Sequence, residues 1–171
     1  MKGAIFFSGK YGSTQQYANW ISEATGLPVF HIIDAEADPS KYDYLVLGSS
    51  ILYFKLSIRH WVKKNQPTLH HRAKILFTVS GAGPGYKLNR WIINSIPEEL
   101  LNQMDHVGLR GKLDHSKVSW FVKLMLWIGS IFNPNPDASK DERYGFDYMD
   151  KSSIQPIVRL IQDIQSNDSE D

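Results

Sequence analysis

The chain has 171 residues, of which 42% are hydrophobic, and a formal net charge of +1. That length and apolar content suffice for one domain with a substantial core, and the near-neutral charge argues against a nucleic-acid partner. The absence of cysteine excludes a disulfide framework, a thiol nucleophile and an iron–sulfur site. The six histidines show no spacing typical of metal ligands, so no metal site is predicted. No signal peptide or membrane-spanning stretch is recognised, and we expect an intracellular protein.

Apolar runs and helical patterns alternate along the chain. Short apolar runs typical of buried parallel strands cover residues 4–7, 29–33, 44–47, 75–79 and, more weakly, 106–109. Helices are predicted at 14–25, after a cap at Ser57, at 86–96 and at 154–164, and a short helix or turn is predicted to begin at Asp38-Pro39. Five parallel strands with helical crossovers predict the α/β class, as a doubly wound sheet with ligands at the carboxyl ends of its strands.

The loop between the first strand and the first helix reads Ser8-Gly9-Lys10-Tyr11-Gly12-Ser13-Thr14. A helix start offers unpaired N–H groups and a partial positive charge, which suit a phosphate. The glycines allow close backbone approach, and the hydroxyls and Lys10 add donors and charge. The spacing fits neither a P-loop nor a dinucleotide fingerprint. An ordinary strand–turn–helix with a Ser/Thr cap is the alternative interpretation.

The pattern Ser8-x-x-x-Gly12-Ser13-Thr14 resembles the phosphate-binding loop of the flavodoxin family. The resemblance implies a five-stranded sheet in the order 2-1-3-4-5 and an FMN cofactor with its phosphate in this loop. The ligand would then lie between the first and third strands, beside the loops at 8–14, 49–56 and 80–87. Candidate phosphate contacts are Ser8, Lys10, Tyr11, Gly12, Ser13 and Thr14.

The other two loops suit the flavin ring. Tyr53 and Phe54 are aromatic residues in an expected loop, where stacking on a planar ring would explain them, although folding back on the core is the alternative. The glycine-rich segment 80–86 allows backbone amides to approach a ring edge, or is simply a flexible turn. The candidates on one side of the ring are Ser50, Ile51, Leu52 and Tyr53. Those at its other edge are Ser80, Gly81, Ala82, Gly83 and Tyr86.

A segment at about 114–143 exceeds what this fold needs and is predicted to interrupt or follow the fifth strand of a single domain at 1–165. Within it, residues 118–132 are apolar nearly all round, yet as a helix they would reach only about 22 Å. Three interpretations stay open: an extra core helix, a peripheral helix in a membrane interface, or a dimer surface. Residues 166–171 form a polar, acidic tail.

The chain also resembles the menaquinone-dependent protoporphyrinogen IX dehydrogenases, which are long-chain flavodoxin-like enzymes. The matching features are the first loop, Gly48-x-Ser50-Ile51-x-Tyr53, residues 117–129 and the segment 144–150. The resemblance implies non-covalent FMN and oxidation of protoporphyrinogen IX in haem biosynthesis, with electrons passed to a quinone. It also implies peripheral contact with the inner face of the cell membrane through 118–132.

Two rival functions remain at this stage. An electron-transfer flavodoxin would have a redox partner protein and no substrate of its own, whereas a flavin-free relative would regulate or scaffold. Carriers of this family usually surround the flavin with acidic residues. Here Lys55, Arg59, Lys87 and Arg90 follow the two ring loops, and such a basic rim suits propionate carboxylates or anionic lipid.

Overall fold

The structure is a computed structural model, and it describes residues 1–81, 85–114 and 145–167. Its strands are β1 (Gly3–Ser8), β2 (Val29–His31), β3 (Tyr44–Leu52), β4 (Lys55–Leu56), β5 (Ala73–Ser80), β6 (Asp105–Arg110), β7 (Lys112–Leu113) and β8 (Phe146–Asp147). The α-helices are α1 (Ser13–Thr25), α2 (Arg59–Leu69), α3 (Tyr86–Ile93), α4 (Glu98–Leu101) and α7 (Gln155–Asn167). Short 3₁₀ turns occupy η1 (Pro39–Lys41) and η2 (Lys151–Ile154).

The central sheet confirms the predicted topology. Its parallel strands lie in the order β2-β1-β3-β5-β6, which is 2-1-3-4-5 when these five strands alone are counted. The short strand β4 adds to the end of β3 in antiparallel fashion. Strand order reverses between β1 and β3, so the carboxyl ends of these two strands mark the expected ligand position.

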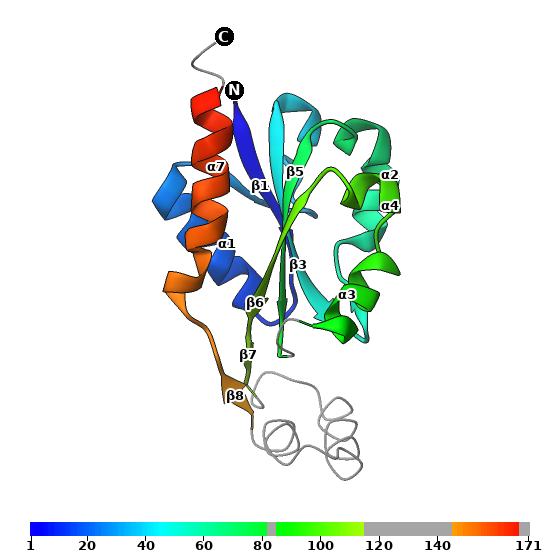
Figure 1. Cartoon of the computed structure of the whole chain (residues 1–171), viewed down its shortest axis with the longest axis vertical. Helices are drawn as coiled ribbons and strands as arrows, with labels where there is room; N and C mark the ends of the chain where they lie inside the picture. The colour runs from blue at the N-terminus through cyan, green and yellow to red at the C-terminus, as the bar shows by residue number, and fades with distance from the viewer. Residues whose placement is uncertain (82–84, 115–144, 168–171) are drawn as a thin grey trace.

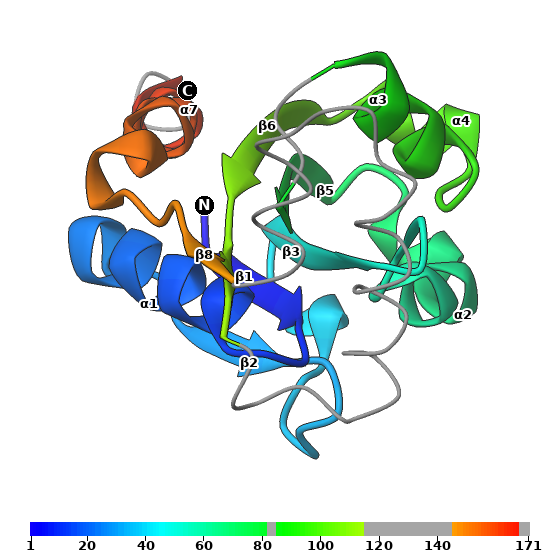
Figure 2. The same cartoon turned by 90° about the horizontal axis from the view of Figure 1, so that it is seen from below.

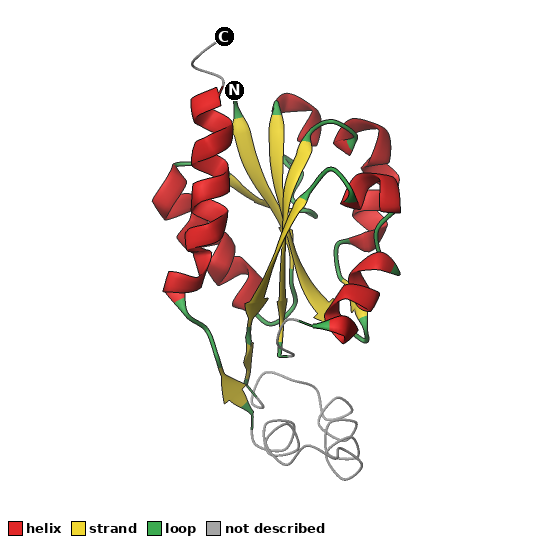
Figure 3. Cartoon of the chain, viewed as in Figure 1, coloured by secondary structure: helices red, strands yellow, loops and turns green. Residues whose placement is uncertain are grey.

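Helices cover both faces of the sheet (Figures 1 and 3). Viewed from below, α1 and α7 lie on one side, and α2, α3 and α4 lie on the other (Figure 2). Successive side chains of β1 enter opposite cores: Ile5 and Phe7 pack under α1 and α7, whereas Ala4 and Phe6 pack in the other cluster. Burial on both faces explains the nearly continuous apolar runs of β1, β3 and β5, whereas the outer strands β2 and β6 are less buried.

The helix starts were only partly predictable from local sequence. Asp38 caps η1 as expected, since its carboxylate accepts a hydrogen bond from the Ser40 amide at 3.0 Å. The predicted cap at Ser57 is wrong: α2 begins at Arg59, and the Ser57 hydroxyl instead donates to the Ser8 carbonyl at 2.8 Å. A contact between residues 49 positions apart outweighs the local capping preference.

Several predicted boundaries also shift. The second strand ends at His31, short of residue 33, and the helix expected to reach 96 ends at Ile93. The third strand continues to Leu52, so the expected loop at 49–56 is a hairpin. The last helix continues to Asn167, two residues into the predicted tail.

The predicted insertion at about 114–143 lies almost wholly outside the described residues. The two strands that flank it, β7 and β8, pair as an antiparallel ribbon, and β7 follows directly after β6. Within the described ranges, no helix combines the length and the apolar composition needed to cross a bilayer.

Candidate functional site

The loop between β1 and α1 forms a helix start of the kind that binds anions. Gly12 adopts a left-handed backbone with φ of 90°, and its carbonyl accepts the first helical hydrogen bond, from the Gln16 amide at 2.9 Å. The amides of Ser13, Thr14 and Gln15 precede that bond, so the helix itself offers them no acceptor. A Cβ on Gly12 would meet no atom within 4 Å, and the backbone there is open to a ligand.

The Thr14 side chain is buried beneath this loop. Thr14 is 1% exposed, and its Oγ1 has no hydrogen-bond partner among the described residues. A Cβ on Gly9 would come within 2.8 Å of that oxygen, so the loop backbone passes directly over it. Leaving a buried hydroxyl unpaired costs about 1–3 kcal/mol. A phosphate held by the loop is the kind of acceptor that such a hydroxyl lacks.

Ser13 connects the loop to the start of β7. Its hydroxyl oxygen accepts a hydrogen bond from the Lys112 amide at 3.1 Å, which leaves its own hydrogen free to be donated. Lys10 is exposed, with its ammonium nitrogen 5.6 Å from the centroid of the Tyr11 ring. The loop therefore combines hydroxyls, amides and one exposed cation at the carboxyl end of β1.

A serine cluster connects this loop to β3. The Ser50 hydroxyl donates to the Ser57 hydroxyl at 3.1 Å, and Ser57 in turn donates to the Ser8 carbonyl. The cluster therefore bridges the carboxyl ends of the two strands at which the sheet order reverses. Ser57 was missed in the sequence as a site residue, because its helix-capping pattern offered a local explanation.

The predicted aromatic residues lie at the tip of the β3–β4 hairpin. Ile51 pairs with Leu56 and Leu52 with Lys55, which leaves Tyr53 and Phe54 as the two turn residues. Both have left-handed backbones, with φ of 50° and 63°, and they are 66% and 70% exposed. Such turns favour Asn-Gly, so two aromatic residues here strain the backbone. The alternative that these side chains fold back into the core is wrong.

Ser80 at the end of β5 and Tyr86 at the start of α3 stand on either side of the third predicted loop. Ser80 is buried at the strand end, and its carbonyl accepts a hydrogen bond from the Gly111 amide at 2.9 Å. Tyr86 opens α3 and is 75% exposed, with the Arg90 guanidinium 5.7 Å from its ring centroid. The predicted contacts Ala82 and Gly83 lie outside the described residues. The remaining predicted residues thus lie at or just after the carboxyl ends of β1, β3 and β5.

Four residues next to the carboxyl end of β5 contact one another in a ring. The Phe146 ring lies so close to Gly81 that a Cβ there would be 2.4 Å from it. Phe146 stacks on Tyr148 with ring centroids 5.0 Å apart, and the Arg110 guanidinium lies 3.6 Å from the Tyr148 centroid. Arg110 completes the set by donating to the Gly81 carbonyl at 3.2 Å. This set was missed in the sequence, which carries no local signal for it.

The base of the β7–β8 ribbon is fixed by polar contacts. The Tyr17 hydroxyl donates to the Arg110 carbonyl at 2.8 Å and accepts from the Asp150 amide at 3.1 Å. Lys112 and Asp147 pair across the ribbon at 2.8 Å. This hydrogen bond raises the pKa of Lys112 and lowers that of Asp147, so it favours the charged form of each side chain.

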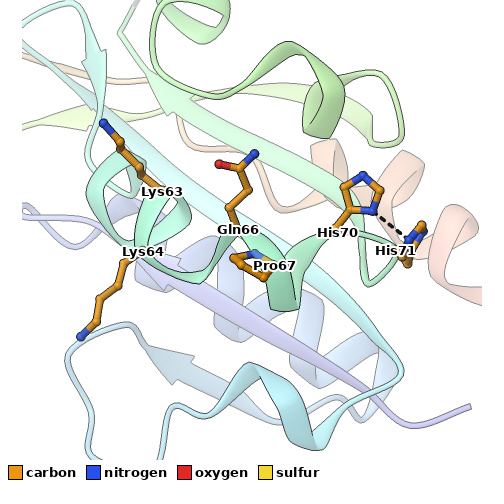
Figure 4. A pocket seen from close by; sticks show the side chains of 6 residues that line it. All are labelled: Lys63, Lys64, Gln66, Pro67, His70 and His71. Carbon is orange, nitrogen blue, oxygen red and sulfur yellow. Dashed lines mark hydrogen bonds between the residues drawn. The ribbon is translucent and has the colours of Figure 1, made fainter.

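A concave region lies away from the carboxyl ends of the strands. It is a shallow hollow at the end of α2, where the His70 and His71 rings are hydrogen-bonded at 2.9 Å (Figure 4). Its remaining lining residues are Lys63, Lys64, Gln66 and Pro67. In the parts of the chain that the structure describes, no group of three or more His, Asp and Glu residues could hold a metal ion. None of these lining residues is a predicted site residue, so the hollow is separate from the site at the strand carboxyl ends.

The comparisons with known proteins agree with this geometry. Residues 4–141 match the sequence profile of the flavodoxin domain. The chain belongs to the flavodoxin domain family. No curated protein matches this flavodoxin-domain chain.

Solved structures resemble this flavodoxin-domain protein at low sequence identity. The Trp repressor binding protein from Bacillus subtilis is 14% identical and has a TM-score of 0.50, with 83% of this chain and 96% of that chain covered. The two-electron reduced flavodoxin from Megasphaera elsdenii is 19% identical and has a TM-score of 0.49, with 62% and 82% covered. Oxidised flavodoxin 1 from Bacillus cereus is 15% identical and has a TM-score of 0.47, with 68% and 89% covered. At such identities the likeness concerns the fold alone.

Proposed function

We propose that this flavodoxin-domain protein is an FMN-dependent oxidoreductase that holds the cofactor phosphate in the loop between β1 and α1. The observation that carries the proposal is the buried Thr14 hydroxyl, which has no partner among the described residues and lies under the Gly9 backbone. It sits at the start of α1, where unpaired amides and the helix dipole already favour a phosphate.

Three segments of the chain would contact different parts of FMN. The amides and hydroxyls of Ser8, Gly12, Ser13 and Thr14 would hold the phosphate, with Lys10 and Tyr11 beside it. The β3 end and hairpin would flank one side of the ring through Ser50, Ile51, Leu52 and Tyr53. Ser80, Gly81 and Tyr86 would meet its other edge, together with the predicted Ala82 and Gly83.

Bound FMN would supply the electron-accepting centre, and the protein would supply its orientation and surroundings. Tyr53 is a candidate for stacking on the ring because the strained hairpin turn holds its side chain out of the core. The Arg110 and Gly111 contacts described above hold the Gly81 and Ser80 carbonyls at the end of β5, where the proposed ring edge would lie.

The proposed substrate is protoporphyrinogen IX, with a quinone as the electron acceptor in haem biosynthesis. Its support is the resemblance of the Ser8–Thr14 loop and of Gly48-x-Ser50-Ile51-x-Tyr53 to those dehydrogenases. Contact of 118–132 with the inner face of the cell membrane belongs to the same proposal and would bring the site near a membrane quinone. Deleting 118–132 should then reduce sedimentation with anionic vesicles while leaving FMN affinity nearly unchanged.

Titration of the apoprotein with FMN, followed by quenching of flavin fluorescence, tests the cofactor. Thr14→Val removes the hydroxyl at nearly constant shape and should weaken FMN binding about tenfold, or about 1.4 kcal/mol. The unfolding free energy of the apoprotein should stay the same or rise, since no protein hydrogen bond is lost. Thr25→Val is the matched control: it removes a hydroxyl bonded to the Ile21 carbonyl and should leave FMN affinity unchanged. An apoprotein that takes up no FMN overturns the proposal.

A second candidate is an electron-transfer flavodoxin, which family membership favours and which would need only a redox partner protein. Anaerobic oxidation of protoporphyrinogen IX, measured with and without a menaquinone analogue, separates the two. Quinone-dependent turnover by the FMN-loaded protein supports the enzyme. An FMN-loaded protein that exchanges electrons with a carrier protein but gives no porphyrinogen turnover supports the flavodoxin.

A further inference from the structure

Charge is strongly segregated along this nearly neutral chain. Residues 44–97 contain eight Lys or Arg residues and no Asp or Glu. The rest of the chain holds the other eleven Lys or Arg residues and all eighteen Asp and Glu. Among the described residues, the carboxylate ion pairs involve Lys41, Lys112 and Lys151, which all lie outside this stretch. The stretch thus gathers positive charge and contains no carboxylate, and the exposed Glu98 and Glu99 of α4 directly follow it.

The fold places this charge on one side of the molecule. Residues 44–97 form β3, β4, α2, β5 and α3. Since β3 and β5 are central strands, the exposed cations of the stretch lie mainly on the hairpin, α2 and α3, opposite α1 and α7 (Figure 2). Lys55 on β4 and Lys87 and Arg90 on α3 are all exposed.

Apolar side chains lie among these cations. Phe54 at the hairpin tip is 70% exposed and Ile93 on α3 is 63% exposed. The partly buried Trp91 lies between the two elements, with its ring centroid 5.4 Å from that of Phe54. On α3, Arg90 is three residues before Ile93 and Lys87 is four before Trp91, so cationic and apolar side chains are neighbours on the helix surface. We call the set of Phe54, Lys55, Lys87, Arg90, Trp91 and Ile93 the α3 face.

We infer that the α3 face docks on an anionic phospholipid surface. Lys and Arg side chains are attracted to anionic headgroups, and aromatic and aliphatic side chains gain by burial at the boundary between headgroups and acyl chains. Phe54 projects from the tip of a two-residue turn, which suits insertion between lipids better than packing on a flat acidic protein. The inference uses only charge and exposure, so it stands independently of FMN binding and of 118–132.

Cosedimentation of the full-length protein with phosphatidylcholine vesicles, with or without phosphatidylglycerol, tests this docking. Binding should require the anionic lipid and weaken with added salt. The partition coefficient should fall about tenfold or more in the triple variant Lys55→Gln/Lys87→Gln/Arg90→Gln. The matched control Lys41→Gln/Lys151→Gln/Arg159→Gln removes the same charge elsewhere and should bind nearly as the unchanged protein does. Equal losses in both triple variants would overturn the inference, because net charge alone would then explain binding.

The apolar part of the α3 face is tested separately. Phe54→Asn suits the left-handed backbone and relieves strain, and Ile93→Ser changes an exposed position, so neither variant should lower the melting temperature. Each should weaken vesicle binding several-fold even at unchanged charge. Unchanged vesicle binding in both variants, with soluble polyglutamate competing fully, would identify a purely ionic site for an acidic macromolecule and overturn the lipid assignment.

Discussion

The Arg110 guanidinium lies 3.6 Å from the centroid of the Tyr148 ring and links the end of β6 to the segment that follows β8. The same guanidinium donates to the Gly81 carbonyl, at the start of the loop after β5. One side chain thus connects the ribbon at the base of the predicted insertion to a loop of the proposed FMN site. Whatever displaces the ribbon would therefore disturb that loop.

Arg110→Ala should lower the unfolding free energy by about 1–2 kcal/mol, because it removes a stacked cation and a hydrogen bond. Tyr148→Ala should cost a similar amount, and the double variant should cost less than the sum, with a coupling of about 0.5–1 kcal/mol. Urea denaturation of the apoprotein measures all three. Arg159→Ala, at an exposed position on α7, is the control and should stay within about 0.5 kcal/mol of the unchanged protein. Strict additivity of the two variants would show that the contact contributes nothing.

Gly12→Ala should weaken FMN binding as well as stability. A Cβ at φ of 90° strains the backbone by about 1–2 kcal/mol, although no atom lies within 4 Å to clash with it. Gly26→Ala imposes similar strain at φ of 73° on the other end of the same helix, also in open space. Both variants should lose comparable unfolding free energy in a thermal melt, whereas FMN affinity should fall only in Gly12→Ala. Equal FMN affinity in the two variants would place the phosphate elsewhere.

The strained hairpin turn should lower the stability of the protein and strengthen FMN binding. Tyr53→Asn combined with Phe54→Gly gives the residues that left-handed turns favour and should raise the unfolding free energy by about 1 kcal/mol or more. The same double variant should bind FMN more weakly, since Tyr53 would no longer cover the ring. Denaturant unfolding and FMN titration measure the two effects. Phe54→Gly alone separates them, because it relieves strain and keeps Tyr53.

His106 should make the protein less stable in mild acid. Its ring nitrogen Nε2 lies 2.9 Å from the Thr78 hydroxyl oxygen, and although the residue is exposed, partial desolvation of the ring lowers the pKa of His106. The unfolded chain therefore binds a proton at about pH 6.5, where the folded chain does not. The contribution of His106 to the unfolding free energy should be constant above that pH. It should fall as the pH decreases below that value. His106→Gln should reduce the loss between pH 7.5 and 5.5 in urea titrations, and an unchanged loss would contradict the prediction.

Local sequence pattern predicted the strands and helices that carry the site. The run Ala4–Phe7, the helix from about residue 14 and Gly26 at its end all follow from side-chain periodicity and backbone preference, which act within a few residues. The loop Ser8–Thr14 could be assigned to phosphate for the same reason, since its glycines and hydroxyls sit at a helix start. Its binding role stays a prediction that the FMN titration tests.

Other features depend on residues far apart in the chain. The hairpin at Tyr53-Phe54 lacks the Gly or Asn that would have indicated a turn, and the pairing of Ile51 with Leu56 imposes it. Ser57 bonds to Ser8, Tyr17 to Arg110, and Arg110 stacks on Tyr148 only because the sheet order brings β1, β3, β5 and β6 together. Helical and strand patterns arise from neighbours along the chain, whereas these contacts exist only once the strands have paired and the helices have packed on them.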